Sequence, residues 1–156
     1  GDSGVDSEPG DQAKLLGKGA RTPEDAYRIA CTVLYSEQFQ RAHPEFIEAQ
    51  IRERAQHPVR PRVFSAQFAA MWQPDNSFQR LAAVTVRALV LHGTEDVVTP
   101  FENARILARQ IPGAELRPFE GFGHLFFHER PAETARLVTE PLRASASHVP
   151  PLPPVG

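Results

Sequence analysis

The sequence predicts an α/β fold in which two parallel strands are joined by a helix, preceded by a helical unit. Three observations carry this prediction. Residues 84–91 contain a short unbroken apolar run, typical of a strand buried on both faces of a parallel sheet. Residues 99–111 have the apolar spacing of an amphipathic helix. Residues 114–119 alternate in polarity, and Pro118 among them indicates an edge strand. A helical crossover of this kind brings the second strand back parallel to the first.

The start and end of the connecting helix are marked in the sequence. Thr99 and Glu102 have the spacing of a capping box, with Pro100 at the first helical position. Pro112 and Gly113 end the apolar pattern. We therefore expect the Thr99 side chain to cap this helix.

The segment before residue 81 has helical periodicity and no strand pattern between its helices. Thr22 is the predicted N-cap of a first helix and Pro23 its first residue. A second helix is expected from Pro44 to about His57, and a third follows it. This segment is predicted to be a small helical unit.

These patterns divide the chain into four predicted parts. The parts are a loop or linker at residues 1–21, the helical unit at 22–80, the strand–helix–strand unit with a final helix at 81–142, and a disordered proline-rich tail at 143–156. The final helix is expected to run from Pro131 to about Val138, because Pro141 follows soon after.

Composition excludes several classes of function. The chain has 17 basic and 19 acidic residues and a net charge of −2, which does not suit nucleic-acid binding. No apolar stretch approaches the roughly 20 residues of a membrane helix, and no secretory leader is recognisable. The single cysteine, Cys31, is expected to pack as a small buried hydrophobic residue. We expect a cytoplasmic protein that binds neither nucleic acid nor membranes.

Two loops at the carboxyl ends of the predicted strands are the expected functional region, because ligands bind there in open parallel sheets. Asp96 lies in the first loop and His124 in the second. Neighbouring strands are only about 4.7–4.9 Å apart, so we expect the two side chains to meet. A carboxylate bound to one nitrogen of an imidazole leaves the other nitrogen free as a general base. Gly93, Gly121 and Gly123 are expected to allow the sharp turns around these residues.

Five short motifs occur around these loops in a fixed order. They are Val90-Leu-His-Gly-Thr-Glu-Asp96, Val98-Thr-Pro100, Ile111-Pro-Gly-Ala114, Gly121-Phe-Gly-His124 and Glu129-Arg-Pro131. Their order and spacing resemble the carboxyl-terminal third of an α/β-hydrolase. The resemblance implies that Asp96 and His124 are the acid and the histidine of a catalytic triad. It also implies that residues 22–80 are similar to the helical cap of esterase and haloperoxidase-like members.

The nucleophile that this family needs is not recognisable in the sequence. The G-x-S-x-G motif is absent, and Gly1-Asp-Ser-Gly4 has Val5 where the second glycine should stand, so Ser3 is interpreted as a coincidence. We expect the nucleophile and the oxyanion loop in an upstream half of the sheet. Without that half, the chain is expected to be inactive and only marginally stable.

The resemblance implies hydrolysis of a small apolar ester through a covalent acyl intermediate, without a cofactor. An aspartate nucleophile would instead indicate a dehalogenase or an epoxide hydrolase. A further alternative is a non-catalytic remnant that acts as an interaction module.

Other residues have weaker indications of function. An apolar substrate pocket could be lined by Phe64, Phe68, Met71, Trp72 and Phe126, with core packing as the alternative. His124, His128 and Glu129 are residue types that bind metals, but their order is not H-E-x-x-H and no third ligand is evident, so no metal is expected. His92 is expected to pack or hydrogen-bond at the strand end, and Glu95 to face solvent.

Overall fold

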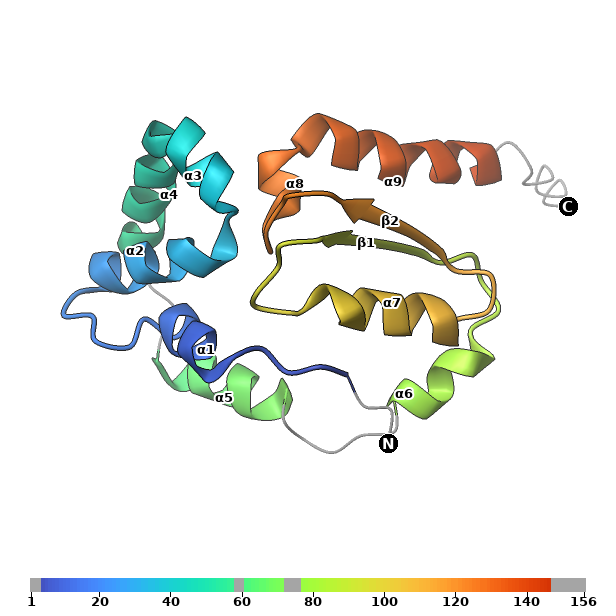
Figure 1. Cartoon of the computed structure of the whole chain (residues 1–156), viewed down its shortest axis with the longest axis horizontal. Coiled ribbons are helices and arrows are strands. Elements are labelled where there is room, and N and C mark those ends of the chain that lie inside the picture. The colour runs from blue at the N-terminus through green and yellow to red at the C-terminus, as the bar shows by residue number, and fades with distance from the viewer. Residues whose placement is uncertain (1–3, 58–60, 72–76, 147–156) are drawn as a thin grey trace, which may run out of the picture.

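The computed structural model describes residues 4–57, 61–71 and 77–146 of the chain. A two-stranded parallel sheet lies at the centre of its carboxyl-terminal part, with α7 along one side and α8 and α9 along the other (Figure 1). The elements are α1 (Pro9–Leu15), α2 (Pro23–Leu34), α3 (Glu37–Ala42), α4 (Pro44–Gln56), α5 (Pro61–Met71), α6 (Ser77–Arg80), η1 (Leu81–Ala83), β1 (Leu89–Gly93), α7 (Phe101–Gln110), β2 (Glu115–Phe119), α8 (Phe126–Glu129) and α9 (Pro131–Ala146).

The predicted crossover is confirmed. β1 and β2 pair in parallel, with Leu89 opposite Glu115 and Gly93 opposite Phe119. Both strands therefore end at the same edge of the sheet. The full burial expected for the first strand is wrong, because residues 89–92 are only half-buried and Val86 before them is 70% exposed. Within the described parts of the chain, β1 pairs with one strand only, so its other side has no strand partner.

The start of α7 differs from the predicted capping box. Pro100 is the N-cap, the helix begins at Phe101, and no side chain caps it. Thr99 is instead used through its backbone, whose N–H donates to the Asp96 carboxylate. A hydrogen bond within the loop between β1 and α7 has therefore replaced the predicted helix cap.

The helical unit forms as its periodicity indicates. The Thr22 side chain accepts a hydrogen bond from the Asp25 N–H and caps α2, and α4 and α5 correspond to the other two expected helices. The side chains of Cys31, Tyr35, Ile47 and Ile51 form the buried core between α2 and α4. Cys31 is 1% exposed, which agrees with its predicted role as a small core residue.

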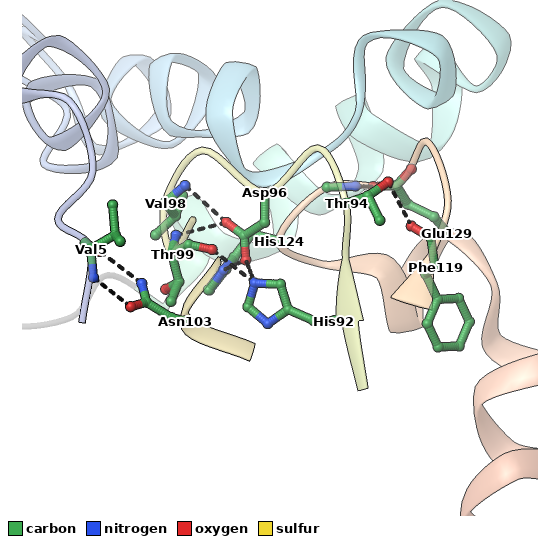
Figure 2. Close-up of polar contacts among 11 residues, drawn as sticks. Val5, His92, Thr94, Asp96, Val98, Thr99, Asn103, Phe119, His124 and Glu129 are labelled. Atoms are coloured by element: carbon green, nitrogen blue, oxygen red, sulfur yellow. Dashed lines mark hydrogen bonds and ion pairs between the residues drawn. The ribbon is translucent and has the colours of Figure 1, made fainter. Parts of the chain in front are cut away.

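Residues 1–21 were expected to be a linker without regular structure, but they contain α1, which packs against α2. Gly17 makes this packing close, because a Cβ there would lie 2.6 Å from the Cβ of Ala26. Before α1, the backbone of Val5 donates to and accepts from the side-chain amide of Asn103 on α7 (Figure 2). These contacts join segments far apart in sequence, so local composition does not reveal them.

The last helix is longer than predicted. α9 continues past Val138 and through Pro141 to Ala146, so the expected disordered tail does not begin at residue 143. A proline removes one helical hydrogen bond and disfavours the helix, but it does not always end one. Residues 147–156 of the expected tail lie outside the described residues. Within the described ranges, no helix is both long and apolar enough to cross a bilayer.

Candidate active site

The ends of β1 and β2 bring Asp96 and His124 together, as the crossover predicts (Figure 2). Nδ1 of His124 lies 2.9 Å from Oδ2 of Asp96. Because a carboxylate oxygen can only accept, Nδ1 carries the proton and Nε2 of the neutral ring keeps a free lone pair. The Asp96 side chain is 2% exposed and that of His124 is 35% exposed. The pair therefore has a buried acid and an imidazole whose edge is open to a reacting group.

The other oxygen of Asp96 is held by backbone groups. Oδ1 accepts hydrogen bonds from the N–H groups of Val98 and Thr99, each 2.8 Å long (Figure 2). Such a turn, closed by the aspartate side chain on its own backbone, fixes the rotation of the carboxylate. Oδ2 is therefore the oxygen that faces His124.

His92 is a second imidazole at the same carboxylate. Its Nε2 lies 2.8 Å from the carbonyl oxygen of Thr99 and 3.2 Å from Oδ2 of Asp96. Both partners are acceptors, so Nε2 of His92 is the protonated nitrogen. The hydrogen bond to Asp96 raises the pKa of His92, although burial opposes this shift. The expected hydrogen bond at the strand end is present, but its partner Asp96 was not predicted.

These contacts determine the charge of Asp96. Burial by itself would raise the pKa of Asp96, but the hydrogen bonds from His124, His92 and the Thr99 N–H outweigh it and hold the pKa far below its usual range. Asp96 is therefore a carboxylate over the whole neutral pH range. It can orient an imidazole and stabilise the positive charge that forms on it.

The lowered pKa of Asp96 predicts how stability depends on pH. A depressed folded-state pKa contributes stability above the unfolded value of about 3.9, and the contribution is lost as pH falls toward the folded value, by up to about 1.4 kcal/mol per pH unit. Asp96→Asn should therefore cost more unfolding free energy at pH 6 than at pH 3 in urea titrations. Glu95→Gln, at an exposed neighbour, is the control. An equal cost of Asp96→Asn at both pH values would contradict this account.

Gly93 is required for a different reason than the turn that the sequence suggested. A Cβ on Gly93 would lie 2.3 Å from the carbonyl oxygens of both Phe122 and Gly123. The end of β1 thus packs directly against the backbone of the loop that carries His124. At Gly121, by contrast, φ is 77°, so the expected turn does need a glycine there.

Gly93→Ala should therefore separate the two loops of the site. We expect a loss of about 1–3 kcal/mol in unfolding free energy, because the added methyl group meets backbone atoms that cannot easily move. Gly10→Ala is the matched control, since Gly10 is in α1 and a Cβ there meets nothing within 4 Å. Denaturant unfolding of both variants measures the difference. A Gly93→Ala protein as stable as the control would show that the close approach is not maintained in solution.

The other predicted site residues have different positions. Phe126 is half-buried, and its ring packs against buried Phe119 with 4.6 Å between centroids, which favours core packing. Phe64, Phe68 and Met71 belong to α5, but their side chains, like the whole of Trp72, lie outside the described residues. The structure also has an open hollow of about 430 Å³ that was not predicted from the sequence. It is lined by Glu37, Gln38, Arg41 and Ala42 of α3 and by Glu95.

The three residues considered for metal binding do not converge on one point. His124 contacts Asp96, whereas Nδ1 of His128 lies 3.0 Å from the hydroxyl oxygen of Tyr35. Glu129 is buried and binds Ser36 and the backbone of the His124 loop. Glu95 is exposed, as expected.

Comparison with known proteins agrees with the fold. Residues 62–143 match the α/β-hydrolase family described as TAP-like protein. The chain belongs to this family of α/β-hydrolases. The match includes both strands, the two loops and most of α9.

Individual relatives match different shares of the chain. The AB hydrolase superfamily protein YisY of Bacillus subtilis is 39% identical over 62 residues, which are 40% of this chain and 23% of YisY. The 2-hydroxymuconate semialdehyde hydrolase of Pseudomonas putida is 38% identical over 94 residues, covering 54% of this chain and 33% of that protein. A thermophilic esterase from Thermogutta terrifontis superposes with a TM-score of 0.68 and 25% identity. That superposition covers 91% of this chain and 53% of the esterase, so the chain spans about half the length of this similar structure.

Proposed function

We propose that this chain supplies the acid and the histidine of a carboxylic-ester hydrolase whose nucleophile lies upstream of residue 1. The observation that carries the proposal is the hydrogen bond between Nδ1 of His124 and Oδ2 of Asp96 at the ends of two parallel strands. Similarity to hydrolases, including the Thermogutta esterase, supports the reaction class. The missing G-x-S-x-G motif and the partial coverage of the relatives support a nucleophile outside this chain.

The roles of the two residues follow from their protonation. Nε2 of His124 accepts the proton of the nucleophile as the nucleophile attacks the ester carbonyl, and later gives it to the leaving alcohol. A water molecule then hydrolyses the acyl intermediate with the same histidine as base. Asp96 stays ionised and stabilises the imidazolium in both steps. The reaction needs no cofactor.

The helical unit is proposed to be the cap of this enzyme. Its α3 lies across the 430 Å³ hollow from Glu95, which is the neighbour of Asp96. A helical segment beside the acid loop is well placed to contact a substrate that reaches His124. The proposed substrate is a small ester with an apolar part.

The test uses the full-length protein that contains this chain, with the 156-residue chain as the matched control. The full-length protein should hydrolyse p-nitrophenyl esters and react covalently with a fluorophosphonate, which labels a serine nucleophile. The 156-residue chain should do neither. Turnover of haloalkanes or epoxides without fluorophosphonate labelling would instead indicate an aspartate nucleophile. Ester turnover by the isolated chain at the full-length rate would show that the nucleophile lies within it and overturn the proposal.

A further inference from the structure

Glu129 is a buried carboxylate that the proposed reaction does not use. It is 7% exposed, and its two oxygens accept three hydrogen bonds. Oε1 accepts from the N–H of Gly123 at 3.1 Å and from the N–H of Ser36 at 3.0 Å. Oε2 accepts from the hydroxyl of Ser36. In the described part of the chain, no cationic side chain pairs with Glu129, so backbone and hydroxyl donors replace the water that it loses on burial.

The partners of Glu129 connect two parts of the molecule. Gly123 directly precedes His124, whereas Ser36 belongs to the helical unit and is the N-cap of α3. A second contact lies on the other side of the histidine, where the Leu125 N–H donates to the Leu34 carbonyl at 2.9 Å. The residue before His124 is thus linked to Ser36 through Glu129, and the residue after it is bound directly to Leu34 at the end of α2.

The loop that carries His124 packs closely against the backbone at Ser36. A Cβ on Gly123 would lie 2.8 Å from the nitrogen of Ser36, so the two backbones are as close as a glycine allows. If Glu129 were removed, the N–H groups of Gly123 and Ser36 would lose their acceptor in a buried place, and the loop would have to move to bring them to water. Such a movement would carry the His124 ring with it.

We propose that Glu129 is a positioning residue for His124. Glu129 links the loop that carries His124 to Ser36 at the start of α3, and this link keeps the imidazole next to Asp96. This inference rests on the proposed function. Glu129 does not touch the reacting atoms. Its carboxylate holds the loop so that Nδ1 of His124 stays within hydrogen-bonding distance of Oδ2 of Asp96.

The test compares Glu129→Ala and Glu129→Gln in the full-length protein. We expect Glu129→Ala to lower kcat for a p-nitrophenyl ester by roughly 10–100-fold with little change in KM, because a misplaced base slows the chemical step. Glu129→Gln keeps an acceptor oxygen for both N–H groups and should recover most of the rate. Glu133→Gln is the control, since the Glu133 side chain is 40% exposed and pairs with Arg130.

A second measurement follows the histidine without catalysis. In ¹⁵N-labelled protein, the Nδ1 proton of His124 should give a low-field NMR signal that is lost or broadened in Glu129→Ala and retained in Glu129→Gln and Glu133→Gln. A Glu129→Ala protein that keeps this signal and a kcat within twofold of the parent would overturn the inference. Loss of activity in His124→Ala in the same series would show that the proposed function still holds.

A pair of serine and threonine variants keeps the test decisive if Glu129→Ala does not fold. Ser36→Ala removes the hydroxyl that binds Glu129 and also the side-chain cap of α3. Thr22→Ala removes the equivalent cap of α2, which has no contact with Glu129 among the described hydrogen bonds. Only Ser36→Ala should lower kcat, by about 3–10-fold, the effect expected for the loss of one hydrogen bond. Equal activity of the two variants would overturn the inference.

Discussion

His124→Ala in the full-length protein is expected to lower kcat for p-nitrophenyl esters by roughly 10⁶-fold, about the loss seen when the histidine of such a catalytic unit is removed. The physical reason is that Nε2 of His124 is the base with a free lone pair next to the buried carboxylate. The fold should survive, because the His124 side chain is 35% exposed and fills no closed core. Steady-state kinetics give the rate, and circular dichroism checks the fold.

His57→Ala is the matched control for this change. His57 is an exposed histidine at the end of α4, away from the two site loops in sequence. It should keep the parent rate. Unchanged ester turnover in His124→Ala would refute the assignment of this histidine as the base, whatever the structure of the pair.

Asp96→Asn should reduce kcat by about 10⁴-fold while the fold remains intact at neutral pH. The backbone N–H groups of Val98 and Thr99 both donate to Oδ1, so they will select the amide oxygen of the asparagine for that place. The amide nitrogen must then stand where Oδ2 stood, 2.9 Å from Nδ1 of His124. Because an amide N–H donates, Nδ1 must accept, the ring proton moves to Nε2, and the base is lost.

The tautomer change can be observed as well as the rate. ¹⁵N NMR of the labelled histidines should show the proton of His124 on Nε2 in Asp96→Asn and on Nδ1 in the parent. Glu95→Gln, one residue earlier and exposed, should change neither the rate nor the tautomer. A slow Asp96→Asn enzyme with the parent tautomer would mean that the charge of Asp96, rather than its orienting hydrogen bond, accounts for the effect.

The sequence predicted correctly those features that depend on neighbours along the chain. The helical periodicity after Thr22 and after Pro44 identified α2 and α4, and the apolar run before His92 identified β1. The contact between Asp96 and His124 was also predictable, although they are distant in sequence. One helical crossover with a fixed hand is enough to place both loops at the same edge of the sheet.

Other features were not predicted because they depend on the orientation of the Asp96 carboxylate, although the residues concerned are only three or four positions away. Thr99 had the local pattern of a helix cap, yet its side chain caps no helix and its backbone N–H donates to the Asp96 carboxylate instead. His92 turned out to share that carboxylate with His124.

By itself, the sequence determined the class of fold and the pair of residues at the sheet edge. Apolar runs and helical periodicity depend on neighbours along the chain, and the crossover rule needs only the order of the strands and the helix between them. Only the tertiary structure decided how that pair is held. Glu129 and Ser36 are 93 residues apart, and no local pattern shows that they meet. A buried carboxylate requires hydrogen-bond donors in place of water. Folding places Ser36, at the start of α3, beside buried Glu129, where Ser36 supplies such donors.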